Sequence, residues 1–193
     1  MRISGGRAKG ILLEVPRSGA VRPATDALRQ AVFSSLGVRV TGARFLDLFA
    51  GSGSYGLEAL SRGAAGGVFV EADPGTAACL RRNLAAVGRS LGLDDPACAV
   101  IPGEVLAVLK GAAVPPETDL VFVDPPYERI AQIAAALFSA LGALLTAERD
   151  PLVVLEMPGD LELSPCGWDG FKRLGRPRGG QPTAAFFRRT DAR

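Results

Sequence analysis

The sequence predicts an α/β protein built on a Rossmann-like, mostly parallel, doubly wound sheet. From Arg44 onward, short apolar runs alternate with segments of helical periodicity, which is the pattern of strands joined by helical crossovers. Gly51, Gly53 and Gly56 follow the first run in the G-x-G-x-x-G spacing, and Glu71 ends the next run. This combination is typical of a strand–turn–helix site for a ligand that carries a ribose. Taken alone, the glycine spacing also fits a close strand-to-helix packing.

Composition and charge indicate one folded domain with basic ends. The chain has 193 residues and a net charge of +2, and a chain of this length buries roughly 70% of its surface on folding. The charge is uneven: residues 1–30 carry +4, residues 31–170 carry −8 and residues 171–193 carry +6. Basic ends favour a polyanionic partner, although solvated termini would give the same pattern.

The residue types exclude several kinds of chemistry. The chain has no histidine, which removes the usual general base and any serine–histidine triad. Its three cysteines are too far apart for a metal-ligand pair, so we expect no metal, and free thiols in a reducing compartment. The N-terminus lacks the apolar core of a signal peptide, and the apolar stretch 130–147 has the spacing of a core-facing helix rather than a membrane span. We therefore expect a cytoplasmic protein that does not bind a membrane.

Residues 1–25 are predicted to form a small N-terminal extension, and residues 26–193 the main domain. The first fifteen residues have the composition of a basic β-hairpin with a glycine-rich turn. A piece this small cannot fold alone and must pack on the main body. A helix is expected at residues 27–36, with Thr25 or Asp26 as its N-cap.

The main domain is expected to contain five parallel strands, their crossover helices and a closing antiparallel hairpin. Strands are predicted at residues 44–49, 67–71, 97–101, 119–123 and 152–156, and helices at 54–63, 75–88, 104–110 and 129–145. Apolar runs near 171–174 and 184–187 flank a basic loop at 175–180. These runs predict an antiparallel hairpin at the edge of the sheet.

Acids at the strand ends are candidate ligand contacts, because a doubly wound sheet binds ligands beyond the carboxyl ends of its strands. The first strand holds Asp47 and runs into the glycine loop, where amides at the helix start favour a carboxylate. The second ends in Glu71, which can accept from both hydroxyls of an unphosphorylated ribose. The third is followed by Glu104, which can accept from the amine of adenine or can simply be a solvated helix start.

The fourth strand ends in Asp124-Pro125-Pro126-Tyr127, the most specific chemical signal in the chain. Two prolines stiffen the backbone and remove two amide donors. The Asp124 carboxylate and the Pro125 carbonyl are left as acceptors beside an aromatic ring. Such a cluster suits an NH2 group on a flat ring, with Tyr127 stacking on the base. The alternative is a rigid loop with a helix-capping aspartate.

Together these motifs resemble an S-adenosylmethionine-dependent amino-methyltransferase, and more narrowly the RsmD family, which methylates a guanine N2 in bacterial 16S ribosomal RNA. The resemblance rests on Arg2-Ile-Ser-Gly-Gly with Lys9-Gly10, Arg22-Pro-Ala-Thr-Asp26, Asp47-Leu-Phe-Ala-Gly-Ser-Gly53, Gly56 to Ala64, and the motif after the fourth strand. It implies the class I methyltransferase fold, S-adenosylmethionine as cofactor, and ribosomal RNA or the assembling small ribosomal subunit as partner. We further expect a monomer.

The resemblance also implies roles for individual residues. The catalytic group comprises Asp124, Pro125, Pro126 and Tyr127. The cofactor-binding group comprises Asp47, Gly51, Ser52, Gly53, Glu71, Ala72, Glu104 and Thr25. The RNA-binding group comprises Arg2, Arg7, Lys9 and Arg22. The sequence departs from the family at Ala27 and Gln30, where arginine and glutamate are usual, and at residues 179–183, which replace a tyrosine-glycine-aspartate-threonine run.

The expected reaction is in-line transfer of a sulfonium methyl group to an aromatic amine. Acceptors that pull on the amine hydrogens let the nitrogen become pyramidal as charge develops, and no histidine base is needed. Two alternatives stay open: an adenine-N6 DNA methyltransferase, because the same loop grips either amine, and a non-catalytic RNA-binding protein on this scaffold. A nicotinamide dehydrogenase would explain the glycines and Glu71 but gives the Asp124–Tyr127 loop no role.

Overall fold

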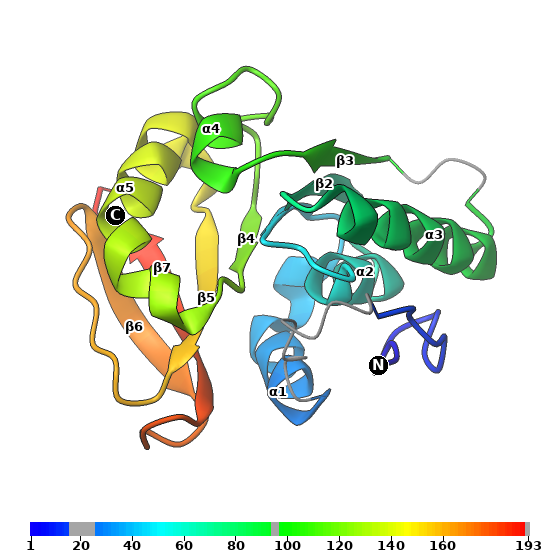
Figure 1. The fold of residues 1–193 in the computed structure, drawn as a ribbon, viewed down its shortest axis with the longest axis horizontal. Coiled ribbons are helices and arrows are strands. Elements are labelled where there is room, and N and C mark those ends of the chain that lie inside the picture. Colours follow the sequence, from blue (N-terminus) through cyan, green and yellow to red (C-terminus); the bar gives the residue numbers. More distant parts are fainter. Residues whose placement is uncertain (16–25, 94–96, 192–193) are drawn as a thin grey trace.

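The computed structural model describes residues 1–15, 26–93 and 97–191, and in these the expected α/β architecture is confirmed. One sheet carries helices on both faces (Figure 1). Its strand order is β3-β2-β1-β4-β5-β7-β6, in which β1 to β5 are parallel, β7 runs antiparallel to β5, and β6 runs antiparallel to β7. The strands are β1 (Arg44–Leu48), β2 (Gly66–Glu71), β3 (Cys98–Pro102), β4 (Leu120–Val123), β5 (Leu152–Pro158), β6 (Trp168–Leu174) and β7 (Pro182–Arg189).

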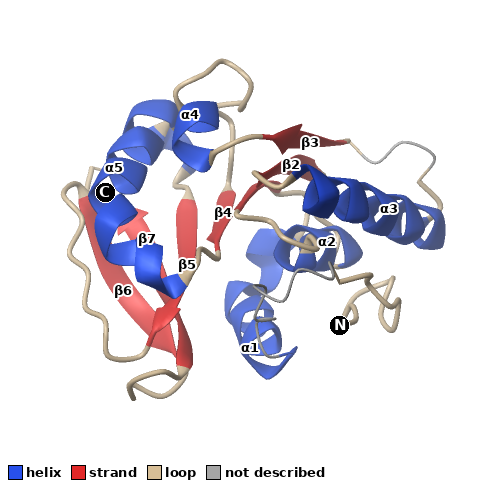
Figure 2. Cartoon of the chain, viewed as in Figure 1, coloured by secondary structure: helices blue, strands red, loops and turns tan. Residues whose placement is uncertain are grey.

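The helices, drawn in blue in Figure 2, have bounds close to the predicted ones. They are α1 (Asp26–Leu36), α2 (Ser54–Ser61), α3 (Pro74–Leu91), α4 (Val105–Leu109) and α5 (Tyr127–Leu144), with short 3-10 turns η1 (Gly37–Val40) and η2 (Ala147–Arg149). Helix α3 runs three residues past its predicted end, to a left-handed Gly92. Helix α5 begins two residues early, because the two prolines hold an extended backbone directly up to its first turn. Of the helices in the described ranges, none is both long and apolar enough to cross a membrane.

The sheet is buried on both faces, and each face has its own hydrophobic core. Phe45 and Phe122 belong to the core under α1, α2 and α3, whereas Leu46 and Val121 belong to the core under α4 and α5. This alternation follows from the two-residue period of a strand. It explains why the strands are continuous apolar runs in the sequence, and it makes the acid at Asp47 an exception.

Helix α2 approaches the sheet more closely than a side chain would allow. A Cβ atom on Gly56 would collide with the ring of Phe69 and would lie 2.6 Å from Cε2 of Phe45. These two rings pack edge to face, with centroids 5.1 Å apart. The last glycine of the motif is therefore required by packing.

The N-terminal residues fold back on themselves without forming extended strands. The two arms meet in one antiparallel bridge between Arg2 and Leu12, and the amide of Ile3 donates to the carbonyl of Ile11 at 2.9 Å. The Gly5–Gly10 turn uses much of the segment, which leaves each arm too short for a ladder. Ile3 is 1% exposed and joins the core over α2 and α3, so the segment packs on the main body as expected.

The C-terminal hairpin is confirmed, and it reaches the ligand-binding edge of the sheet. Strand β7 pairs antiparallel with β5, with Pro158 opposite Pro182. The loop from 175 to 181 therefore lies at the end of the sheet where the parallel strands have their carboxyl termini. Here the amide of Gly159 donates to the carbonyl of Gln181 at 2.9 Å, which ties the loop to the end of β5.

We expect Gly56→Ala to lower the free energy of unfolding by about 1–3 kcal/mol, because the added methyl group overpacks the contact between α2 and the sheet. Chemical denaturation measures the change. Gly111→Ala is the control, since a Cβ there would lie 3.4 Å from the nearest carbonyl, and it should change stability by less than about 0.5 kcal/mol. Equal losses in the two variants would contradict the close approach.

Candidate active site

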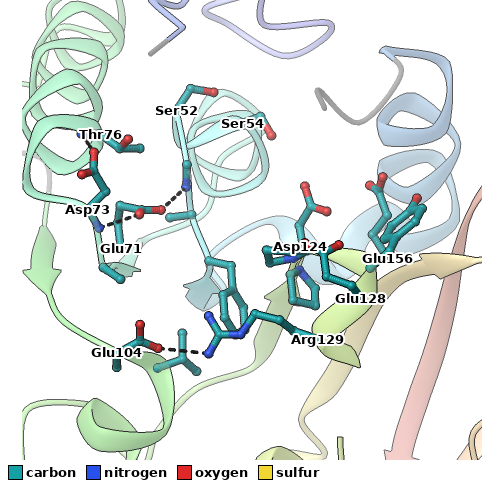
Figure 3. A pocket seen from close by; sticks show the side chains of 18 of the residues that line it. Ser52, Ser54, Glu71, Asp73, Thr76, Glu104, Asp124, Glu128, Arg129 and Glu156 are labelled. Atoms are coloured by element: carbon teal, nitrogen blue, oxygen red, sulfur yellow. Dashed lines mark hydrogen bonds and ion pairs between the residues drawn. The ribbon is translucent and has the colours of Figure 1, made fainter. Parts of the chain in front are cut away.

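The parallel strands end around a cavity of about 470 Å³, within the usual size range of small-molecule sites. An acid stands within two residues of the end of every one of these strands. In the order of the sheet they are Glu104, Glu71, Asp47, Asp124 and Glu156. All but Asp47 line the cavity, and Figure 3 shows these four around it.

The turn after β1 forms one wall of the cavity. Phe49 has φ 58° and Gly51 has φ 55°, and a left-handed non-glycine residue such as Phe49 stores roughly 1–3 kcal/mol of strain. Glu71 fixes this turn, because its Oε2 accepts from the amide of Gly51 and its Oε1 from the amide of Asp73, each at 2.9 Å. The carboxylate therefore joins the turns after β1 and β2.

Asp47 lies beneath the turn and does not reach the cavity. It is 1% exposed, and its Oδ2 accepts from the amide of Gly56 at 2.8 Å. Burial raises its pKa to about 8; the Gly56 hydrogen bond opposes this rise and the charge of Glu71 adds to it. Gly53, also expected near the cofactor, sits behind the turn with φ 84°, packed on Leu80.

All four residues from Asp124 to Tyr127 line the cavity. The amide of Asp124 donates to the carbonyl of Leu48 at 3.3 Å, which anchors the loop beside the end of β1. Pro126 stands just before α5 and Tyr127 is its first residue. Loss of hydration raises the pKa of Asp124 well above its usual range, and the nearby charges of Glu156 and Asp47 raise it further.

Glu156 and Tyr55 are site residues that sequence reasoning missed. Glu156 is 4% exposed near the end of β5, lines the cavity, and accepts from the hydroxyl of Tyr55 at 2.9 Å. The ring of Tyr55 stacks on Phe122, with centroids 5.3 Å apart. Burial raises the pKa of Glu156, opposed by hydrogen bonds from Tyr55 and Tyr127 and by the charge of Arg29. An acid that ends an apolar run, the same signal as Glu71, could have revealed Glu156.

Arg29 of α1 is a buried cation beside this group. It is 0% exposed, lies 2.8 Å from Asp26 and 3.5 Å from the buried Glu58, and donates to the carbonyl of Arg2 at 2.7 Å. It therefore holds together α1, α2 and the N-terminal arm. Its positive charge also lowers the free-energy cost of ionising Glu156 in the neighbouring wall of the cavity.

The far rim of the cavity is more open. Glu104 and Arg129 form an exposed ion pair at 3.3 Å. Asp73 caps α3 by accepting from the amide of Thr76 at 2.7 Å, and bonds from Thr76 hold the pKa of Asp73 below its usual range. Within the described ranges, no three acidic, cysteine or histidine side chains cluster as metal ligands do.

The structure brings together most of the expected cofactor residues, whereas Arg7 and Lys9, two of the expected RNA residues, do not line the cavity. Gly51, Ser52, Glu71, Ala72 and Glu104 line the cavity. Two expected contacts, Thr25 and Arg22, lie outside the described residues.

The basic turn of the N-terminal segment lies away from the cavity. Arg2, Arg7 and Lys9 are exposed, but the amide of Arg7 donates to the carbonyl of Ser61 at 2.7 Å. Ser61 ends α2, which starts at the cavity, and a helix of this length spans roughly 12 Å. Arg7 and Lys9 therefore sit about one helix length from the strand ends.

Comparisons with known proteins agree on one family. A family model described as conserved hypothetical protein 95 matches residues 1–187, well past the region that carries the sequence motifs. The chain is 40% identical over 129 residues to "Ribosomal RNA small subunit methyltransferase D" of Escherichia coli (strain K12), which is 67% of this chain and 61% of that protein. The match thus spans less than two thirds of that relative's length.

Two further relatives are matched over most of their length. "Putative rRNA methyltransferase YlbH" of Bacillus subtilis is 34% identical over 165 residues, covering 84% of this chain and 85% of that protein. The solved structure of "Putative methyltransferase yhhF from Escherichia coli" has a TM-score of 0.79 at 32% identity, covering 98% of this chain and 97% of that one. Fold and sequence therefore point to the same group of proteins.

The raised pKa of Asp47 predicts a pH dependence of stability. Because Asp47 binds a proton more tightly in the folded protein (about 8) than at the ordinary value of 3.8, its stabilisation is complete at low pH and is lost as the pH rises through that folded value. Asp47→Asn should show a shallower fall in the free energy of unfolding as the pH rises from the ordinary value of 3.8 to about 8. Urea denaturation at a series of pH values measures this fall. A fall as steep as that of the wild type would contradict the assignment.

Proposed function

The chain belongs to the family described as conserved hypothetical protein 95, in keeping with its resemblance to the RsmD family, and from this membership we propose that it is an S-adenosylmethionine-dependent ribosomal RNA methyltransferase acting on the exocyclic N2 of a guanine. The observation that carries the proposal is the Asp124-Pro125-Pro126 loop on the cavity wall, which offers acceptors and two prolines without amide donors. The names of the relatives support RNA as the substrate. We propose that the enzyme works as a monomer in the cytoplasm, on ribosomal RNA or the assembling small subunit.

The cavity suits S-adenosylmethionine by its charge. Six acidic side chains line it, against one arginine: Glu71, Asp73, Glu104, Asp124, Glu128, Glu156 and Arg129. This excess of negative charge favours a ligand with a cationic centre and disfavours a pyrophosphate, as in a nicotinamide dinucleotide. When bound, S-adenosylmethionine supplies a methyl group on a positively charged sulfur.

Each wall of the cavity has a matching role. The Gly51–Ser52 turn would hold the methionine end, with backbone amides at the start of α2 facing its carboxylate. Glu71 would accept from the ribose hydroxyls, since its two oxygens stand between the turns after β1 and β2. Glu104 would accept from the amine of adenine, beside the apolar Val105.

The acceptor loop would activate the amine by accepting hydrogen bonds from its two hydrogens. In an aromatic amine the nitrogen lone pair is delocalised into the ring, so the nitrogen is a weak nucleophile. Asp124 and the carbonyl of Pro125 would accept its two hydrogens more strongly as positive charge develops on nitrogen, which lowers the barrier. Tyr127 would stack on the base, which has to leave its RNA stack to enter the cavity.

RNA phosphates must stay outside this acidic cavity, and the basic β6–β7 loop is placed to hold them. Arg176 and Arg178 are exposed in this loop, at the edge where the parallel strands end. Arginines at such an edge can hold the backbone while one base enters the cavity. In this proposal the RNA backbone would lie nearer the C-terminal hairpin than the distant turn at Arg7 and Lys9.

We expect Asp124→Ala to lower turnover by at least about 10²-fold, because it removes an acceptor that acts in the transition state, while cofactor affinity stays within a few-fold. Asp124→Asn keeps one acceptor oxygen and should retain more activity than the alanine variant. Methyl transfer to small subunits that lack the modification measures turnover, and calorimetry measures cofactor binding. Unchanged turnover in Asp124→Ala would rule out this role.

Replacing Arg176 and Arg178 together by glutamine should raise KM for RNA several-fold, leave kcat nearly unchanged, and weaken the dependence of KM on salt. Arg89 and Lys110, exposed elsewhere on the surface, give a control pair with the same loss of charge. If the control pair changes KM as much as the loop pair, the loop is not the contact surface.

A further inference from the structure

Glu156 is a buried acid of the cavity wall that methyl transfer to an amine does not by itself require. We propose that Glu156 selects guanine, by accepting the N1–H of the target base beside the N2 amine that Asp124 accepts. This inference rests on the proposed function, which needs only Asp124 and Pro125 to grip an amine. It gives a reason why the base should be guanine.

The sheet register places the two acids side by side. Strands β4 and β5 are parallel neighbours, with Val123 opposite Leu155, so Asp124 and Glu156 are the next residues on adjacent strands, whose backbones lie roughly 4.8 Å apart. Val123 and Leu155 both face the core under α4 and α5, and the alternation along each strand turns the next side chains toward the opposite face. Figure 3 shows the two carboxyl groups next to each other at the cavity.

Two adjacent acceptors match guanine and no other common base. The guanine amine lies next to the N1–H on the Watson–Crick edge, so two neighbouring donors face outward. Adenine and cytosine instead carry a ring lone pair beside the amine on that edge. A carboxylate such as Glu156 would accept from the N1–H of guanine, but it would repel the lone pair of either other base.

Neighbouring side chains orient the Glu156 carboxyl group and favour its ionised form. The hydroxyl of Tyr55 donates to its Oε2 at 2.9 Å, and Tyr127 donates a further hydrogen bond. These donors and the buried charge of Arg29 favour the ionised carboxylate against the burial that raises its pKa. Glu156 is only 4% exposed, so water cannot replace the hydrogen bond that is lost when the base has no N1–H. Binding such a base is therefore costly.

A competing reading makes Glu156 only a link between α2 and β5 through Tyr55. In that case Glu156→Gln, which has the same shape, would alter activity on every base by the same factor. If Glu156 reads N1, the amide NH2 of the variant can donate to a base that carries a lone pair there. The two readings therefore differ in the ratio of activities on two bases.

The test uses small subunits reconstituted with RNA whose methylated guanine is either retained or replaced by 2-aminopurine, which keeps the 2-amino group but has a lone pair at N1. We expect the wild type to prefer guanine by at least about 10²-fold in kcat/KM. Glu156→Gln should lower kcat/KM for guanine and reduce the guanine to 2-aminopurine ratio at least about 10-fold. Glu128→Gln, which removes a charge from the same cavity, should leave the ratio unchanged.

An unchanged ratio in a folded Glu156→Gln variant, with a melting temperature near that of the wild type, would overturn the inference. If that variant does not fold, Tyr55→Phe is tested instead. It removes the hydrogen bond to one oxygen of Glu156 and should lower the guanine to 2-aminopurine ratio by a smaller factor. An unchanged ratio in Tyr55→Phe would also overturn the inference. If the wild type forms no N2-methylguanine on the unaltered RNA, both the proposed function and the role of Glu156 fail. If it does and only the ratio is unaffected, the proposed function stands.

Discussion

The site depends on acids that are buried or half-buried near the ends of adjacent parallel strands. Strands β1, β4 and β5 are neighbours, and each brings an acid to the same edge: Asp47, Asp124 and Glu156. A buried carboxylate is costly unless it is hydrogen-bonded, and two of the three acids have a hydrogen-bond donor inside the protein. Asp47 takes the amide of Gly56 and Glu156 takes the hydroxyl of Tyr55, while all three pKa values are raised. The resulting cavity is lined by several acidic side chains, which favours cationic or donor-rich ligands.

Much of this was predictable from the sequence, because local patterns specify local structure. The apolar runs, the glycine spacing and the loop after β4 gave the sheet, the turn and the acceptor cluster. The Tyr55–Glu156 contact spans 101 residues of sequence, and no local pattern reports such a pairing. Asp47 was expected near the ligand, but the strand alternation that turns Phe45 toward α2 turns Asp47 the same way, under the turn rather than into the cavity.

The uneven charge of the chain acquires a spatial meaning in the fold. The acidic middle of the sequence contains the strand-end acids that line the cavity, whereas the basic C-terminal part supplies Arg176 and Arg178 in the loop beside the end of β5. A substrate with an anionic backbone and a neutral, donor-bearing base matches this division, since the backbone can stay on the rim while the base enters. The basic N-terminal turn lies farther away, so its link to RNA is a separate question from chemistry at the cavity.

The most direct test of the proposed activity is the identity of the methylated atom. Small ribosomal subunits from a bacterial strain that lacks the corresponding modification would be incubated with the protein and isotope-labelled S-adenosylmethionine. Their RNA would then be digested to nucleosides and mapped by mass spectrometry. We predict N2-methylguanosine at a single position of the small-subunit RNA. Label in N6-methyladenosine, label in added DNA instead of RNA, or no transfer at all would contradict the assignment.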